Sequence, residues 1–185
     1  MILPLLFLLA QSSLGPADST LKIVQRLLPV QTRQRDTTRN DIVIHNDGMN
    51  LSATTVHSAL RHSRLSYHFF VDRSGRVFQF MSLDRVAEHA GRSKHLNTKQ
   101  WNDFSIGICL QGSNFVGYTK AQYASLNKLI RNLTLRYKHL GPIHVVGHNE
   151  VAYPKGRKSD PGKHFDWKQL HYGIRTVPQA ARRRH

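Results

Sequence analysis

Residues 102–112 read NDFSIGICLQG, and this stretch decides the fold that the sequence predicts. Its middle part, Ser105–Gln111, is a short apolar run with the length and composition of a central strand. Upstream of it, the aromatic and β-branched segments Tyr67–Val71 and Arg76–Phe80 flank the turn sequence DRSG, so they predict a β-hairpin. Together these segments indicate a β-sheet.

A long amphipathic helix is predicted after this sheet segment, at Thr119–Leu140. Thr119 and Gln122 have the spacing of a capping box, and Gly141 is placed to end the helix. Apolar residues recur along it at helical spacing, so one face should pack on the sheet. They are Tyr123, Leu126, Leu129, Ile130, Leu133 and Tyr137.

Further elements alternate between strand and helix. The short apolar segments Asp41–His45 and Ile143–Gly147 predict strands, and Leu51–His62 predicts a helix. This alternation is typical of α/β or α+β proteins. We therefore expect the α/β class, with a single mixed β-sheet flanked by helices.

The chain has 185 residues, which is room for one domain with flanking segments. Its single cysteine, Cys109, excludes a disulfide framework and a zinc site made only of cysteines. Met1–Ala10 is apolar, with the length of a signal-peptide core and too short to cross a bilayer, so we expect export and no transmembrane segment. The expected organisation is a signal peptide at 1–17, a basic lead-in arm at 18–40, a domain at 41–172 and a basic tail at 173–185.

The composition is strongly basic. Lys and Arg number 27 against 11 Asp and Glu, which gives a formal net charge of +16. Such a chain should bind polyanions, whether nucleic acid, anionic lipid or an anionic cell-wall polymer. A nucleic-acid-binding protein would interleave aromatic and basic residues on one platform, whereas the charges here are scattered through the arm, the long helix and the tail. We therefore expect no nucleic-acid partner.

Three side chains with metal-ligand chemistry stand at positions that a fold can bring together. His45 and His148 each end a predicted strand, and Asp160 lies in the loop that follows His148. Two imidazoles and one carboxylate form a standard ligand set for a catalytic zinc ion, with the fourth position left to water. On spacing alone the same residues also fit surface or capping roles, so the pattern is weak by itself.

Two other hydrolase chemistries fit the sequence less well. Cys109 stands in mid-strand, without a helix N-terminus to lower the pKa of its thiol, so we expect a buried inert cysteine rather than a nucleophile. A lysozyme-type glycosidase usually needs two carboxylates flanking the bond. No pattern in the sequence pairs Asp47, Asp72 or Asp103.

Seven motifs occur in the order of a known family: VIHN, SYHFFVDRSGRVFQF, EHAG, NDFSIGICLQG, FVGYTKAQYASL, VVGHNEVA and GRKSDPGKHFDW. Through them the chain resembles, over roughly Asp41–Trp167, the zinc-dependent N-acetylmuramoyl-L-alanine amidases. That family includes bacterial anhydromuramoyl-peptide amidases, phage endolysin amidases and peptidoglycan recognition proteins. The resemblance implies the family fold and one zinc ion in a groove, held by His45, His148 and Asp160.

The resemblance also implies catalytic roles for Tyr67, in the motif SYHFFV, and for Lys158, two residues before Asp160. In the cytosolic bacterial branch a small residue usually replaces this tyrosine, and a glutamate usually stands where this sequence has Cys109. The phage branch tolerates cysteine there and relies on the tyrosine and the lysine. We therefore expect no glutamate base.

Substrate contacts are expected beside these motifs, at Asn46, His89 and Arg157. Asn46 can hydrogen-bond sugar or peptide groups, His89 matches a groove-lining histidine of the family, and Arg157 can meet a stem-peptide carboxylate. The sequence thus predicts an exported, monomeric zinc amidase that cuts between N-acetylmuramic acid and L-alanine in peptidoglycan or muropeptides. The alternative left open is a peptidoglycan-binding protein without catalytic activity.

Overall fold

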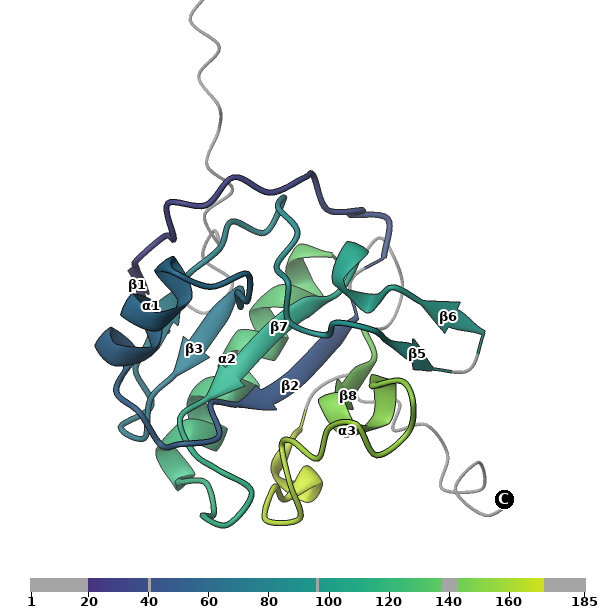
Figure 1. The fold of residues 1–185 in the computed structure, drawn as a ribbon. Helices are drawn as coiled ribbons and strands as arrows, with labels where there is room; N and C mark the ends of the chain where they lie inside the picture. The colour runs from purple at the N-terminus through teal and green to yellow at the C-terminus, as the bar shows by residue number, and fades with distance from the viewer. Residues whose placement is uncertain (1–19, 40, 96, 138–142, 172–185) are drawn as a thin grey trace, which may run out of the picture.

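A six-stranded mixed β-sheet forms the centre of the computed structural model, which describes residues 20–171 except 40, 96 and 138–142 (Figure 1). The strand order is β1-β4-β3-β7-β2-β8. β3 and β4 pair antiparallel, as the predicted hairpin requires, and the other neighbours pair parallel, so the predicted mixed sheet is confirmed. The strands are β1 (Ile23–Gln25), β2 (Ile42–Asn46), β3 (Phe69–Val71), β4 (Val77–Gln79), β7 (Ile106–Leu110) and β8 (Val145–Gly147).

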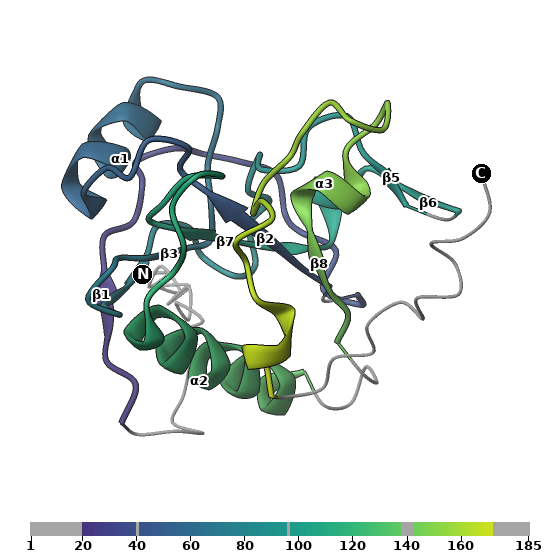
Figure 2. The same cartoon turned by 90° about the horizontal axis from the view of Figure 1, so that it is seen from below.

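Helices cover both faces of this sheet. Figure 2 shows α2 (Lys120–Arg136) along one face and α1 (Ala53–Arg61) on the opposite side. The capping box predicted for α2 is present, because the Thr119 hydroxyl accepts from the Gln122 amide and the Gln122 side chain accepts from the Thr119 amide. α2 ends before the predicted Leu140, which lies outside the described residues. The short elements are α3 (His148–Val151), β5 (Lys94–His95), β6 (Thr98–Lys99) and the 3-10 helices η1 (Trp101–Asp103) and η3 (Trp167–Gln169).

Side-chain alternation along β2 decides which face of the sheet carries the polar residues. Ile42 and Ile44 belong to the core cluster beneath α2, so Val43 and His45 point to the opposite face. On the neighbouring strand β7, Cys109 pairs with His45 and belongs to the apolar cluster beneath α1. The face turned away from α2 therefore holds both this histidine and the single cysteine.

Residues 20–39, the described part of the segment expected as a lead-in arm (18–40), pack against the sheet. Its strand β1 pairs with β4 at the edge of the sheet, and Leu28 is buried. Arg35 is also buried, and its guanidinium donates to the main-chain oxygens of Leu83 and Phe104, both at 2.7 Å. A buried guanidinium needs such acceptors, and a pattern of scattered basic residues does not reveal them. The described part of this segment therefore packs onto the sheet.

The expected leader at residues 1–17 and the expected tail at 173–185 lie outside the described residues. Within the part of the chain that is described, no helix has the length and apolar character needed to cross a membrane.

Candidate metal centre

His45 and His148 are brought together by two adjacent parallel strands. His45 is the fourth residue of β2, and His148 directly follows β8 as the first residue of α3. Because β2 and β8 pair in parallel, their carboxyl ends meet at the same edge of the sheet. Gly147 lacks a side chain at a crowded point, since a Cβ atom would lie 2.3 Å from the Asn149 side chain and 2.9 Å from Pro161. The turn into α3 is thus packed tightly against the following loop.

Asp160 reaches the two histidines from a loop that hydrogen bonds hold in place. Its main-chain oxygen accepts from the Asn149 amide at 2.9 Å. The next carbonyl oxygen, that of Pro161, accepts from the Tyr118 hydroxyl at 2.7 Å and from the Asn46 side-chain amide at 3.3 Å. These contacts fix the backbone around the carboxylate, although the preceding loop residues are exposed.

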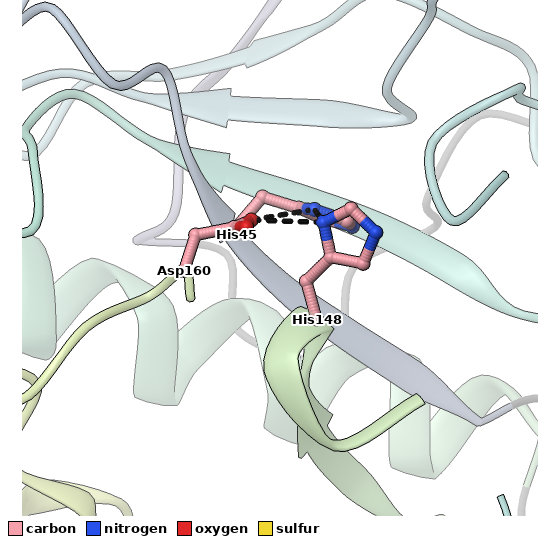
Figure 3. Close-up of side chains that lie close together, drawn as sticks. All are labelled: His45, His148 and Asp160. Atoms are coloured by element: carbon pink, nitrogen blue, oxygen red, sulfur yellow. Dashed lines mark hydrogen bonds and ion pairs between the residues drawn. The ribbon is translucent and has the colours of Figure 1, made fainter. Parts of the chain in front are cut away.

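Three donor atoms converge at this edge of the sheet (Figure 3). The Nδ1 atoms of His45 and His148 are 3.1 Å apart, and Asp160 Oδ2 lies 3.1 Å from the first and 3.0 Å from the second. The histidine side chains are buried, whereas that of Asp160 is 14% exposed. Among the described residues, these three form a group that can hold a metal ion. The structure thus brings together the residues that the sequence predicted as metal ligands.

The charge states of these residues suit a metal ion. Burial lowers the pKa of His45 to about 4, with the Asp160 carboxylate opposing the shift and His148 adding to it. His45 is therefore neutral at neutral pH, as a metal-binding imidazole must be. The carboxyl group of Asp160 is ionised at neutral pH, as an aspartate ordinarily is. The site offers neutral imidazole and ionised carboxylate together.

The second ring nitrogen of each histidine also has a partner. His45 Nε2 lies 3.0 Å from His89 Nδ1, and His148 Nε2 lies 3.1 Å from the main-chain oxygen of Ala90. His89 is 4% exposed and lies on the side of His45 away from the other two donor atoms, and its contact with substrate stays a prediction. Sequence reasoning missed these two partners of the histidine rings, although it had singled out the motif EHAG that supplies both.

Tyr67, a predicted catalytic residue, packs against the first of these histidines. Its ring centroid is 5.3 Å from that of His45, and the ring planes are tilted by 54°. Burial raises the pKa of the phenol well above its ordinary value, and Cys109 and Asp160 add to the shift. A phenol with a raised pKa keeps its proton at neutral pH, and the Tyr67 hydroxyl forms a hydrogen bond with the Cys109 side chain, while the ring lies against His45.

Lys158, the second predicted catalytic residue, lies in the same loop as Asp160, and its side chain is exposed. Its positive charge is one of the causes of the lowered pKa of His45. The ammonium therefore lies within electrostatic range of the three donor atoms. A role in the reaction stays a prediction for this residue and for Tyr67.

Asn46 and Arg157, two of the predicted substrate contacts, make hydrogen bonds within the protein. The buried Asn46 amide donates to Asn114 Oδ1 at 2.8 Å and to the Tyr118 hydroxyl at 3.1 Å. Arg157 is exposed, and its Nη2 donates to the main-chain oxygen of Ala90 at 2.8 Å. Both side chains thus support the loops around the three donor atoms, and their contact with substrate stays a prediction.

Cys109 faces the same side of the sheet as His45, its partner across β2 and β7. The thiol is fully buried, and burial raises its pKa well above the ordinary value. A buried, protonated thiol is a poor nucleophile. The structure therefore supports the predicted inert cysteine and gives no basis for a cysteine hydrolase.

A polar cavity of about 520 Å³ opens next to the segment that contains Ala90. Two of its cations, Arg92 and Lys94, lie over the ring of Tyr153 at 4.9 and 5.9 Å from the centroid. The cavity is therefore positively charged and has an aromatic wall. Its lining residues are Gly91, Arg92, Ser93, Lys94, Lys99, Gln100 and Tyr153.

Comparison with known proteins places this fold and site in one family. The N-acetylmuramoyl-L-alanine amidase family model matches residues 35–163, and the chain belongs to that family. The chain is 41% identical over 106 residues to the 1,6-anhydro-N-acetylmuramyl-L-alanine amidase AmpD of Haemophilus influenzae. That match covers 57% of this chain and 56% of AmpD, so the chain spans little more than half the length of this curated relative.

Solved structures share the same architecture. A crystal structure of a selenomethionine derivative of AmpD superposes with a TM-score of 0.66 at 30% identity, covering 80% of this chain and 92% of the other. AmiD of Escherichia coli, solved with the substrate anhydro-N-acetylmuramic acid-L-Ala-D-gamma-Glu-L-Lys, gives a TM-score of 0.63 at 28% identity. The latter match covers 77% of this chain and 60% of AmiD. The expected family fold is thereby confirmed.

Proposed function

We propose that this protein binds one zinc ion and hydrolyses the amide bond between N-acetylmuramic acid and L-alanine in peptidoglycan or muropeptides. The observation that carries the proposal is the convergence of His45 Nδ1, His148 Nδ1 and Asp160 Oδ2 within 3.1 Å of one another. Membership of the N-acetylmuramoyl-L-alanine amidase family supports it. So does the similarity to AmiD, which was solved with a muropeptide substrate.

The donor set fits zinc in number, type and spacing. Catalytic zinc sites take three protein ligands from histidine and carboxylate side chains and leave a fourth position open. A tetrahedral ion with bonds of ~2.0–2.1 Å places its ligands ~3.3 Å apart, by the geometry of that coordination. The observed separations of 3.0 to 3.1 Å need only a small expansion around an ion. His45, His148 and Asp160 would therefore hold the zinc.

When bound, zinc supplies Lewis-acid polarisation of the amide carbonyl and a nucleophile from water at neutral pH. The protein side chains then have to stabilise the negative charge that develops on the carbonyl oxygen and to handle protons. The ammonium group of Lys158 suits the stabilisation of this oxygen. Tyr67 has a protonated phenol beside His45, so it can orient the reacting groups by donating a hydrogen bond.

The cationic cavity beside Ala90 suits the charged part of such a substrate. Stem peptides of peptidoglycan carry carboxylates, and Arg92, Lys94 and Lys99 line the cavity. Arginine and lysine bind carboxylates through charge-assisted hydrogen bonds. We propose that the stem peptide extends from the metal centre toward these side chains.

We further propose that the protein is exported and acts as a monomer. The apolar segment Met1–Ala10 and the net charge of +16, which favours retention on an anionic wall, support export. N-terminal sequencing of protein recovered from the cell envelope tests it, with a new terminus near residue 17 expected. Recovery of the full-length chain from the cytoplasm alone would contradict export.

Metal removal tests the proposed chemistry. A strong chelator should abolish dye release from labelled sacculi, and one equivalent of zinc should restore it, because the nucleophile depends on the ion. Full activity in a metal-free sample would contradict the mechanism. A zinc-loaded protein that binds sacculi without releasing dye would instead support the non-catalytic alternative.

A further inference from the structure

We propose that His89 and the carbonyl of Ala90 are positioning groups, which fix the nitrogen that each histidine ligand presents to the metal. The inference rests on the proposed zinc site and adds a supporting layer of residues behind it. It follows from the direction in which each hydrogen bond around His45 and His148 has to run.

The direction is simplest to establish at His148. A carbonyl oxygen can only accept, so His148 Nε2, which lies 3.1 Å from Ala90 O, carries the ring hydrogen. In a neutral imidazole the lone pair is then on Nδ1. That atom faces Asp160 Oδ2 at 3.0 Å. The Ala90 carbonyl thus selects the tautomer that can bind a metal through Nδ1.

At His45 the position of the ring hydrogen is fixed through two further side chains, those of His89 and Ser105. The Ser105 hydroxyl makes a very short contact with the main-chain oxygen of Trp101 and donates its proton there. The Ser105 oxygen therefore accepts from His89 Nε2, at 3.4 Å. This leaves His89 Nδ1 as the acceptor for His45 Nε2, 3.0 Å away. The lone pair of His45 is consequently on Nδ1, which points at the other donor atoms.

Together the tautomers fixed at His45 and His148 prepare a site for a cation. With both ring hydrogens held on Nε2, the Nδ1 lone pairs of His45 and His148 face each other and Asp160 Oδ2 across 3.0 to 3.1 Å. No hydrogen is shared among these three atoms, so they repel one another unless a cation lies between them. Orientation by such partners is known to raise metal affinity.

Contacts with strand β7 and with Asn102 hold His89 in this position. A Cβ atom on Gly107 would lie 2.5 Å from His89 Cγ, so strand β7 has a glycine where the imidazole lies against it. The main-chain amides of His89 and Ala90 both donate to Asn102 Oδ1, at 3.0 and 2.7 Å. The segment His89–Ala90, held by Asn102, therefore supplies the hydrogen-bond partners of both histidine ligands.

Zinc affinity, measured by competition with a chromophoric chelator, tests the proposal without any measurement of activity. His89→Leu removes the acceptor for His45 Nε2, and the affinity should fall about 10–100-fold, as is typical when such a partner is lost. His89→Asn puts a carbonyl oxygen close to the position of Nδ1 and should restore most of the affinity. His68→Leu is the matched control, because His68 is a buried neighbour of His89 whose ring nitrogens bond to main-chain groups. Its zinc affinity should equal that of the parent.

Equal zinc affinity in the parent and in folded His89→Leu overturns this inference, and so does an Asn variant as weak as the Leu variant. A parent protein that binds no zinc overturns the proposed function instead. A second measurement needs no variant and covers the case in which His89→Leu does not fold. Long-range ¹H–¹⁵N correlation spectra of the metal-free parent should place the ring hydrogens of His45 and His148 on Nε2. A hydrogen on Nδ1 of either ring overturns the inference.

Discussion

The Nδ1 atoms of His45 and His148 lie 3.1 Å apart, although 103 residues separate the two histidines in the sequence. They meet because β2 and β8 are parallel neighbours, and the loop after α3 brings Asp160 Oδ2 within 3.1 Å of both. No one of these residues can hold an ion alone, since zinc takes three protein ligands in such sites. The carboxylate is therefore as necessary as the imidazoles.

Asp160→Ala should lose bound zinc and at least ~100-fold in turnover, because losing a ligand costs more than the 10–100-fold typical of its supporting partners. Metal content by atomic emission and dye release from sacculi check the two effects. Asp166→Ala, which removes an exposed carboxylate further along the same loop, is the control and should keep its zinc. An Asp160→Ala protein with one zinc per chain would show that the ligand set is misassigned.

Tyr67→Phe should keep the fold and the zinc but lose about 100–1000-fold in turnover, the usual cost of removing one preorganised donor. The physical reason is that the phenol keeps its proton beside His45. Tyr137→Phe makes the same chemical change in the core cluster beneath α2, on the other face of the sheet, and should leave turnover unchanged. A Tyr67→Phe enzyme as fast as the parent contradicts the assignment.

Lys158→Ala should likewise retain zinc and lose about 100–1000-fold in turnover, because its charge is assigned to the oxygen of the scissile carbonyl. Lys155→Ala, in the same exposed loop, controls for the loss of one positive charge. Combining Lys158→Ala with Tyr67→Phe should cost much less than the product of the single losses, since residues that act as a unit are not additive. Strictly multiplicative losses would mean that the two side chains act independently.

Cys109→Ser should remain active, because the thiol is buried and protonated and has no part in the proposed chemistry. The hydroxyl enters an apolar cluster but keeps Tyr67 as a hydrogen-bond partner, so the free energy of unfolding should fall by less than the ~1–3 kcal/mol that an unpaired buried hydroxyl costs. Chemical denaturation and dye release measure the two properties on one sample. A folded, zinc-loaded but inactive variant would give Cys109 a role that the structure does not.

Local patterns in the sequence were sufficient for the main elements of the fold. α2 begins at the capping box formed by Thr119 and Gln122, as predicted. The apolar run around Cys109 forms the central strand β7. β1 was missed because an edge strand of three residues, Ile23–Gln25, is too short to show a period, and its last two residues are exposed. Its place depends on pairing with β4, which is distant in the sequence.

The metal ligands were predictable because each one lies in a sequence motif shared with the amidase family. The role of His89 was not, since its burial depends on the missing side chain of Gly107 and on the clamp made by Asn102. Those contacts join segments that no local pattern connects. The hydrogen bonds that hold Asn46 to Asn114 and Tyr118 were hidden for the same reason.

Mass spectrometry of peptidoglycan digested by the zinc-loaded protein tests the central claim most directly, because it names the bond that is cut. The proposed function predicts stem peptides with a free L-alanine amino terminus and glycan whose N-acetylmuramic acid has lost its peptide. The same digest with the Asp160→Ala protein should contain neither product. Cleavage at a glycosidic bond or within the stem peptide, or no product from a zinc-loaded protein, would contradict the account.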